Sequence, residues 1–325
     1  MDAPDTIITR FAEQVRGGET ACPNGPMRLG VDLGTANLVL SVVDADNNPV
    51  AGAWQHTTVV RDGIVVDWTG AVHFVKALKE QLEQRLNTRF TTASVSIPPG
   101  ISEGTIRVFT NVLTASDLIP DEVVDEPVAA ARVLGVTDGC VIDIGHGTTG
   151  VSVLNGGRVV TSVDEPTGGH HMTLVLAGAH NISYDEAEDL KQRQGNEIFG
   201  VIRPTVEKMA TIAARAIAGY EVSQVYLVGG SSCFDAAPGV FSDILELPVH
   251  RPAEPLFVTP LGIPMTGTPV NRGAGEDEPD LVDRKGEGSD AGAALTDDDV
   301  AERRFGATAA VCPVLRSFTK EVNHG

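Results

Sequence analysis

Apolar runs bounded by turn-forming residues alternate with stretches of helical spacing in the first half of the chain. Runs rich in Val, Ile and Leu predict strands at 29–43 (two strands), 50–54, 64–66, 93–97 and 122–124. Apolar residues that recur every three or four positions predict helices at 72–86, 103–115 and 126–134. Alternation of this kind is typical of an α/β fold.

The second half opens with the same pattern as the first. A strand pair is expected over 139–154, followed by the turn Asn155-Gly156-Gly157 and a third strand over 159–163. The remaining expected elements are helices at 172–179, 184–193 and 204–219, and a buried strand at 224–228 that runs into Gly229-Gly230.

The repeat is visible in the residues themselves. Val31-Asp32-Leu33-Gly34-Thr35 is echoed by Ile142-Asp143-Ile144-Gly145-His146-Gly147-Thr148, and each segment begins a three-stranded unit of similar length. Internal duplication of this kind predicts two lobes of one topology that face each other across a cleft.

The two ends of the chain differ from the repeated body. The first 27 residues combine a short amphipathic helix with a linker rich in Gly and Pro. From Thr268 to Arg304 there are eleven acidic and five basic residues and few apolar ones, which predicts disorder. The expected domains are an N-terminal appendage over 1–27, lobe I over 28–140, lobe II over 141–267 and an acidic, largely disordered tail over 268–325.

Composition excludes several classes of protein. The formal net charge is −20, whereas a nucleic-acid binder or a protein docking on anionic lipid needs a basic face. No apolar run approaches the roughly 20 residues that span a bilayer, and the four cysteines are scattered without a Cys-x-x-Cys pair. We therefore expect a reduced, cytoplasmic protein without nucleic-acid or membrane partners.

Each repeat places an Asp directly before a glycine-rich turn that contains Thr. Glycines let backbone N–H groups converge on an anion, and Thr hydroxyls add donors. Asp32 and Asp143 would repel a phosphate directly, so their positions favour a divalent cation held through water between carboxylate and phosphate, as Mg²⁺ prefers. A single turn of this kind is more often an ordinary tight hairpin, whereas two duplicated turns favour a clamp for a polyphosphate.

Two further segments are candidates for chemistry. Gly229-Gly230-Ser231 follows a strand, which fits either a turn that needs positive φ or a backbone approach to a nucleoside. Glu126 begins a helix of small residues, Pro127-Val128-Ala129-Ala130, whose simplest role is a close packing contact between the lobes. The carboxylate of Glu126 either stabilises that helix terminus or, facing the cleft, orients a water for in-line attack.

These motifs together resemble the actin-like ATPase superfamily, which includes actin, the bacterial protein MreB and the ATPase domain of the chaperone DnaK. Within it, residues 28–267 are most similar to the EutJ family, which belongs to the ethanolamine-utilisation operons of bacterial microcompartments and is described as chaperone-like. The segments that carry the resemblance are the two Asp-Gly turns, Glu126-Pro127-Val128-Ala129-Ala130, Asp164-Glu165-Pro166-Thr167-Gly168-Gly169-His170, Ala187-Glu188-Asp189-Leu190-Lys191, Val228-Gly229-Gly230-Ser231 and Thr259-Pro260-Leu261-Gly262.

The resemblance implies two ribonuclease-H-like lobes around a nucleotide cleft that binds ATP or ADP with Mg²⁺. It implies that Asp32 and Asp143 hold Mg²⁺ through water, and that Asp143 and Glu126 act on the attacking water. The nucleotide-binding residues that it implies are Gly34, Thr35 and Asn37 in the first turn, Gly145, Gly147, Thr148 and Thr149 in the second, and Gly229, Gly230 and Ser231 beside the adenosine.

Several residues depart from the superfamily pattern. Gly150 stands where the chaperones carry a second Asp, His146 replaces a glycine, and the chaperone lysine has no counterpart beyond Arg61. About a dozen residues separate Lys191 from Pro204, where relatives insert the subdomain that covers the base, so lobe II is expected to lack most of it. Weak nucleotide binding and slow turnover follow. A metal site at His146, His170 and His171 is disfavoured, because no carboxylate or cysteine lies at ligand spacing.

The resemblance implies a chaperone-like ATP-binding protein, with slow ATPase activity as a further expectation. Its partner would be a protein client, such as ethanolamine ammonia-lyase or a shell protein, and its location the cytoplasm with microcompartment association. The alternatives are an actin-like scaffold without turnover and a small-molecule kinase. The N-terminal helix resembles an encapsulation peptide in form, but packing on its own lobe is the expected role.

Overall fold

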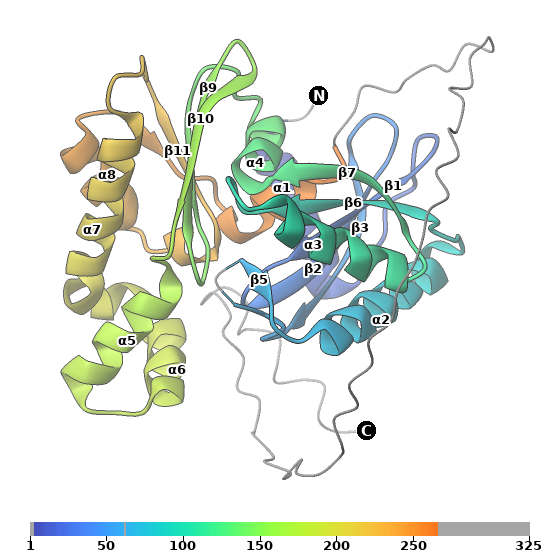
Figure 1. Ribbon diagram of the computed structural model, residues 1–325, viewed down its shortest axis with the longest axis horizontal. Helices are drawn as coiled ribbons and strands as arrows, with labels where there is room; N and C mark the ends of the chain where they lie inside the picture. The colour runs from blue at the N-terminus through green and yellow to red at the C-terminus, as the bar shows by residue number, and fades with distance from the viewer. Residues whose placement is uncertain (1–2, 62, 266–325) are drawn as a thin grey trace, which may run out of the picture. The chain divides into compact units, whose positions relative to one another are not determined.

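The computed structural model describes residues 3–61 and 63–265 (Figure 1). The predictions for the acidic tail lie outside the described residues. Within the described part, no helix has both the length and the apolar character needed to cross a membrane.

The first sheet has the strand order β3-β2-β1-β6-β7. Its strands are β1 (Arg28–Leu33), β2 (Asn37–Val43), β3 (Pro49–His56), β6 (Thr92–Ile97) and β7 (Ile119–Asp125). Strands β1, β2 and β3 form an antiparallel meander, whereas β6 runs parallel to both β1 and β7. A separate hairpin joins β4 (Val60–Arg61) to β5 (Ile64–Val65). The strands predicted for the first half are therefore confirmed.

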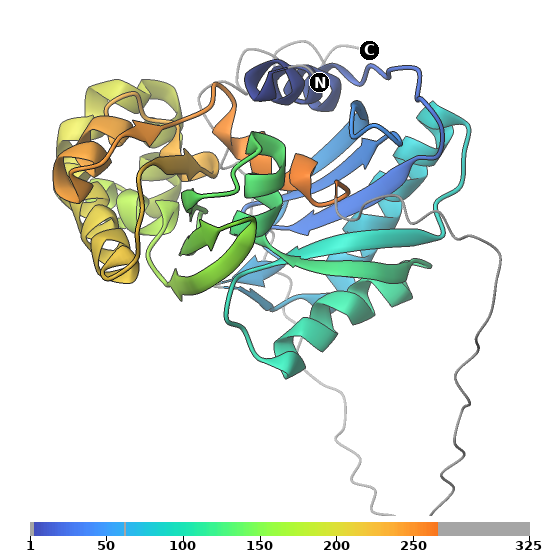
Figure 2. The same cartoon turned by 90° about the horizontal axis from the view of Figure 1, so that it is seen from above.

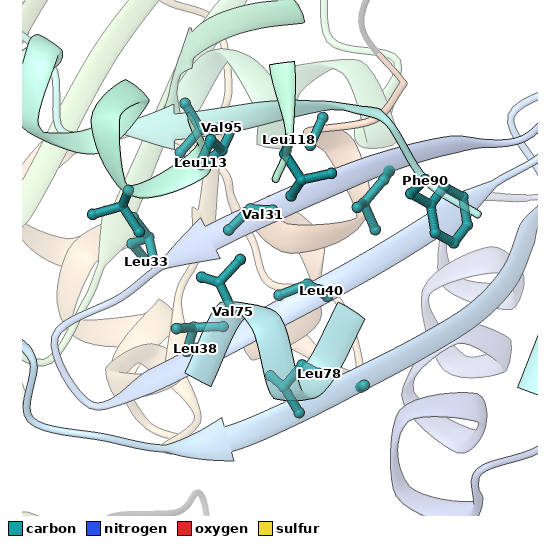
Figure 3. Close-up of a cluster of buried hydrophobic side chains, with 14 of the residues drawn as sticks. Val31, Leu33, Leu38, Leu40, Val75, Leu78, Phe90, Val95, Leu113 and Leu118 are labelled. Carbon is teal, nitrogen blue, oxygen red and sulfur yellow. The ribbon is translucent and has the colours of Figure 1, made fainter. Parts of the chain in front are cut away.

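Helices α2 (Trp68–Leu86) and α3 (Glu103–Ala115) cover one face of this sheet (Figure 1). The side chains of Asp67 and Ser102 accept hydrogen bonds from first-turn N–H groups and fix where the two helices begin. Figure 3 shows the apolar side chains that fill the space beneath the helices, among them Val31, Leu40 and Val75. This rigid layer holds the turn between β1 and β2 in place.

The second sheet repeats the arrangement in the order β10-β9-β8-β11-β12. Its strands are β8 (Gly139–Ile144), β9 (Thr149–Asn155), β10 (Arg158–Glu165), β11 (Val225–Val228) and β12 (Val249–His250). Helix α7 (Phe199–Ile217) packs on β9 and β10, and α5 (Gly169–His180), α6 (Tyr184–Gln194) and α8 (Ala237–Leu245) share its apolar cluster. The two meanders and their parallel neighbours confirm the predicted duplication.

Helix α7 corrects one prediction from the sequence. It begins at Phe199, five residues before Pro204, where the sequence analysis places its start. Pro204 removes one helical N–H donor and crowds the carbonyl four residues earlier, which belongs to the exposed Gly200. Buried Phe199 and Ile202 anchor the first turn, so packing outweighs this cost. Only the short helix η1 (Gly195–Ile198) separates α6 from α7, which confirms that lobe II lacks a large inserted subdomain.

A third layer of helices contacts both sheets and contains α1 (Pro4–Gly17), α4 (Glu126–Leu134) and α9 (Val258–Gly262) (Figure 2). Their buried side chains share one apolar cluster with Val39 of the first sheet and Val141 of the second. The described structure shifts the predicted lobe boundaries in two places. The second sheet already begins at Gly139, and α9 returns to pack on β1 and β2 of the first lobe.

Helix α1 packs against β3 instead of standing apart from the body as an appendage. Ile8 and Phe11 are fully buried, and the Phe11 ring meets Phe257 edge to face, with centroids 5.9 Å apart. Arg16 forms two hydrogen bonds with Glu254, at 2.8 and 2.6 Å, and lies over the Phe257 ring. The helix therefore fastens the segment around Glu254 to the first lobe, as expected for packing on its own lobe.

Replacing Arg16 by Ala is expected to lower the free energy of unfolding by about 2 kcal/mol, because Glu254 is left half-buried without its cation. Chemical denaturation measures the change, and Glu13→Ala, an exposed change on the same helix, should have little effect. The double variant Arg16→Ala/Glu254→Ala should lose clearly less than the sum of the two single losses. Additive losses would contradict a direct interaction.

Candidate functional site

A cleft lies where the turns of the two repeats approach one another. The space between its walls, open solvent included, is about 1100 Å³. The residues predicted for the site that line it are Asp32, Gly34, Thr35, Asn37, Glu126, Asp143, Gly145, Gly147, Thr148, Gly229, Gly230 and Ser231. Side chains far apart in the sequence thus border one cavity.

The first turn joins β1 to β2 and places backbone at the cleft wall. A Cβ atom on Gly34 would lie 2.6 Å from the carbonyl oxygen of Asn37, so any larger residue would force the turn open. Ser96 of β6 donates a hydrogen bond to Asp32 at 3.1 Å and orients that carboxylate. The Oδ1 atom of Asn37 is buried and has no hydrogen-bond partner among the residues that the structure describes. The backbone of this turn and the side-chain oxygen of Asn37 are therefore available to contact a ligand.

The second turn joins β8 to β9 and is braced from two sides. The N–H of Gly145 donates to the carbonyl of Thr148 at 3.0 Å, which closes the turn. The carbonyls of Gly145 and His146 accept hydrogen bonds from the N–H groups of Gly169 and His170 at the start of α5. These hydrogen bonds lock the turn to the helix, and a Cβ atom on Gly168 would lie only 2.5 Å from the carbonyl oxygen of His146, which explains the glycine before α5.

Thr149 does not lie with the other predicted residues of the second turn. Its side chain is fully buried, and its hydroxyl donates to the carbonyl of Thr167 instead of lining the cleft. The hydroxyl therefore holds the β9 end of the turn against the segment that precedes α5, and it is not available to a ligand in this arrangement.

Three buried carboxylates, those of Asp32, Glu126 and Asp143, line the cleft together. Burial and the charge of Asp143 raise the pKa of Asp32 to about 7, although the Ser96 hydroxyl opposes this shift. Burial raises the pKa of Asp143 to about 6, although Thr259 donates a hydrogen bond to it. Burial, followed by the charges of Asp143 and Asp32, raises the pKa of Glu126 well above its usual value. A divalent cation held through water between these carboxylates and a bound anion would relieve this repulsion.

The third turn follows β11 at Gly229, where φ is +87°. A Cβ atom there would lie 2.3 Å from Oδ1 of Asp143 and 2.4 Å from the carbonyl oxygen of Ile144, so only glycine fits. The N–H of Gly229 donates to the carbonyl of Pro255, which connects this turn to the segment that α1 fastens. The positive φ predicted for this turn is therefore confirmed, whereas the approach of a nucleoside to its backbone stays a prediction.

The sequence analysis did not assign site roles to Thr259, Glu188 or Lys191. Thr259, from the chain that returns to the first lobe, is the hydrogen-bond donor to Asp143. Glu188 and Lys191 on α6 line the cleft and form a buried ion pair at 2.7 Å. All three lie in segments that carry the family resemblance, but their pairing depends on tertiary contacts that no local pattern encodes.

The histidines of lobe II form a hydrogen-bonded group with Tyr184. The Tyr184 hydroxyl lies 3.1 Å from Nε2 of His146 and 2.9 Å from Nδ1 of His170. Burial, followed by the nearby charge of Lys191, lowers the pKa of His146 to about 4, so this imidazole is neutral at physiological pH. Among the described residues, no group of His, Cys, Asp and Glu has the arrangement of a metal centre.

Two protein families match parts of the chain. The cell division protein FtsA family matches residues 140–267, and the MreB/Mbl family matches residues 51–177. The structure of MreB5 from Spiroplasma citri, solved with bound ADP, has a TM-score of 0.59 at 18% identity and covers 73% of this chain and 94% of that one. These matches show the actin-like fold.

Two relatives are much more similar in sequence. The ethanolamine utilization protein EutJ of Salmonella typhimurium is 44% identical over 248 residues, which is 76% of this chain and 88% of that protein. The crystal structure of EutJ from Carboxydothermus hydrogenoformans has a TM-score of 0.76 at 41% identity and covers 81% of this chain and 98% of that one. The chain therefore belongs to the EutJ family of ethanolamine utilization proteins and has the actin-like ATPase fold.

Proposed function

We propose that this chain binds ATP or ADP with Mg²⁺ in the cleft between its lobes and acts as a nucleotide-dependent, chaperone-like protein. Its client would be an enzyme or shell protein of a microcompartment for ethanolamine use, such as ethanolamine ammonia-lyase. The observation that carries nucleotide binding is the convergence of two duplicated glycine turns and their aspartates, Asp32 and Asp143, on one cleft. The ADP bound to Spiroplasma citri MreB5, a protein of the same fold, supports this assignment.

The residues of the cleft divide into three tasks. Backbone N–H groups of the two turns bind phosphate oxygens, because the glycines Gly34, Gly145 and Gly147 leave room for an anion to approach the backbone. Asp32 and Asp143 hold Mg²⁺, through water in the manner that this ion prefers. Gly229 and its neighbours support the nucleoside.

Hydrolysis depends on the protonation of Glu126. When bound, Mg-ATP supplies the phosphoanhydride bond that water can cleave. The raised pKa of Glu126 favours the protonated form of its carboxyl group in the nucleotide-free cleft. With a divalent cation bound nearby, this pKa would fall, and the Glu126 carboxylate would polarise a water molecule. We propose slow turnover, because Gly150 provides no second carboxylate at the end of the second turn.

A client would recognise the closed conformation of the two lobes. The third helix layer contacts both sheets. Ligand contacts that draw the two turns together would therefore also shift the packing of this layer. Nucleotide can bias closure only through its different affinity for open and closed lobes. The alternative is a scaffold of the same fold without turnover, which the missing carboxylate at Gly150 also favours.

Calorimetric titration of Mg-ADP and Mg-ATP tests the assignment. We expect saturable binding to the wild-type chain and a loss of at least about tenfold in affinity for Asp143→Asn, which retains an acceptor for Thr259 but removes the charge. Asp117→Asn is the matched control, because Asp117 is an exposed carboxylate remote from the residues that line the cleft. Release of phosphate from ATP would show that the chain also has ATPase activity. Absence of binding at millimolar nucleotide would contradict the proposal.

A further inference from the structure

The two aspartates of the cleft each accept a hydrogen bond from a hydroxyl group, but the hydroxyls come from different kinds of element. Ser96 of strand β6 donates to Oδ1 of Asp32 at 3.1 Å. Thr259 of helix α9 donates to Oδ2 of Asp143 at 2.5 Å. An ionised carboxylate can only accept, and hydrogen bonds to a charged group are among the stronger ones. Each hydroxyl therefore holds its carboxylate in one orientation.

The sheet registers show that the second lobe does not repeat this detail of the first. In the first sheet, the parallel pairing of β1 with β6 places Asp32 beside Ser96. The equivalent neighbours in the second sheet are β8 and β11, where Asp143 lies opposite Val228. Val228 carries no hydroxyl group, so the duplicated sheet provides no donor at that position. Asp143 obtains its donor from Thr259, 116 residues away in the sequence.

The helix that carries Thr259 is held by the first lobe. Helix α9 packs on β1 and β2. Ser41 of β2, which is fully buried, donates to the carbonyl of Pro260 at 2.6 Å. Just after the helix, Arg28 of β1 donates to the carbonyl of Pro264 at 2.9 Å. The donor for the carboxylate of the second lobe is therefore fixed to strands of the first.

The hydrogen bond from Thr259 also distinguishes the two oxygens of Asp143. Oδ2 is engaged with the Thr259 hydroxyl, whereas Oδ1 lies beside Gly229, at a point where a Cβ atom would approach it within 2.3 Å. The last torsion of an aspartate has broad minima, so without the hydroxyl this carboxylate is free to turn. Thr259 thus fixes which oxygen is held by protein and which is left beside the third turn.

We propose that Thr259 is a positioning residue for Asp143, and that it holds this carboxylate in the orientation that binds hydrated Mg²⁺ while α9 keeps its place on the first lobe. A carboxylate of one lobe is then completed by a donor anchored on the other, so the same hydrogen bond couples binding in the cleft to the arrangement of the lobes. This inference rests on the proposed function, because it requires a Mg-nucleotide in the cleft.

The experiment measures ADP binding by calorimetry, once with Mg²⁺ and once with EDTA. In the wild type, Mg²⁺ should raise the affinity about tenfold or more, because the aspartates act through the ion. Thr259→Val keeps the shape of the side chain without the hydroxyl, and it should reduce this enhancement to about threefold or less. Its affinity for ADP in EDTA should stay within about twofold of the wild type, and Thr259→Ser, which retains the hydroxyl, should keep most of the enhancement.

Three further variants locate the effect. Thr205→Val is the matched control, because Thr205 is a buried threonine of α7 that does not line the cleft, and it should keep the wild-type response to Mg²⁺. Ser41→Ala loosens the anchor of α9 away from the cleft wall and should lower the enhancement by about threefold, so it carries the test if Thr259→Val does not fold. In an Asp143→Asn background, Thr259→Val should cause no further loss of the enhancement.

The outcomes separate this inference from the proposed function. An unchanged enhancement in Thr259→Val, or an equal loss of affinity with Mg²⁺ and with EDTA, would overturn the role of Thr259 and leave nucleotide binding intact. A loss in Thr259→Ser as large as in Thr259→Val would assign the effect to packing and overturn that role as well. No binding of ADP by the wild type in either condition would overturn this inference together with the proposed function.

Discussion

Replacing Asp32 by Asn is expected to raise the melting temperature of the nucleotide-free protein at pH 8 while weakening the binding of Mg-nucleotide. The Asp32 carboxylate is buried and faces the charge of Asp143, which together raise its pKa to about 7. Asn keeps the size of the side chain and still accepts the hydrogen bond from Ser96. The gain should be about 2 kcal/mol after allowance for solvent screening, or roughly 4–8 °C in melting temperature.

The gain should depend on pH in a direction fixed by linkage. The folded state holds the Asp32 proton more tightly than the unfolded state does, so wild-type stability from this group falls as pH rises from about 4 to about 7. The advantage of Asp32→Asn is therefore complete above pH 7 and disappears as the pH falls towards 4. Melting curves of both proteins across this range measure it, and a less stable variant at pH 8 would contradict the repulsion.

Asp44 is a control with the opposite expected sign. It is also a buried aspartate of the first lobe, but hydrogen bonds from Asn48, Asn24 and Asp46 outweigh the effect of burial and lower its pKa. Asp44→Asn should therefore destabilise the protein at pH 8, because the amide accepts these N–H groups less strongly than the carboxylate does. Opposite shifts for the two variants would separate electrostatic strain at the cleft from a general effect of removing buried charge.

The second large effect is expected for Gly262→Ala, where α9 crosses α4. A Cβ atom at Gly262 would lie 1.9 Å from the carbonyl oxygen of Ala129 and 3.0 Å from a methyl group of Val133. The first neighbour is helix backbone, so α4 and α9 must separate. We expect a loss of about 3 kcal/mol or more, or roughly 6–12 °C in melting temperature by circular dichroism.

The matched control for this variant is Gly178→Ala. Gly178 is exposed inside α5, and a Cβ atom there would meet nothing within 4 Å. This change should stabilise the protein by about 0.5–1 kcal/mol through helix propensity. If Gly262→Ala melts within a degree or two of the wild type, the two helices are not closely packed in solution.

The local patterns of the chain were sufficient to predict most of the sheet framework. Alternating apolar runs placed both meanders, and small residues at Ala129 and Ala130 predicted a close contact for α4. The partner in that contact could not be predicted, because α9 has only five residues and carries no periodic pattern of its own. Helix α7 extends through Pro204 for a similar reason, since burial of Phe199 and Ile202 is a tertiary effect.

In the candidate site, too, local patterns predicted some features, whereas others depend on tertiary contacts. The duplicated Asp-Gly turns identified the residues that border the cleft. The residues of an anion-binding turn are adjacent in the sequence, so they can be recognised as a local motif. Thr149 lies in the same turn, yet its hydroxyl serves Thr167, a distinction that depends on where the chain passes before α5. Thr259 reaches Asp143 from 116 residues away in the sequence, so no spacing rule could pair them.

The docking of α1 sets a thermodynamic condition on any other use of that helix. Its apolar face, formed by Ile7, Ile8, Phe11 and Val15, is already buried against the body of the protein. Releasing these four side chains costs on the order of 6 kcal/mol or more. A shell protein or client that competes for this face would therefore bind about ten-thousandfold more weakly than it binds the isolated helix. Such a partner gains access only when another interaction offsets the undocking.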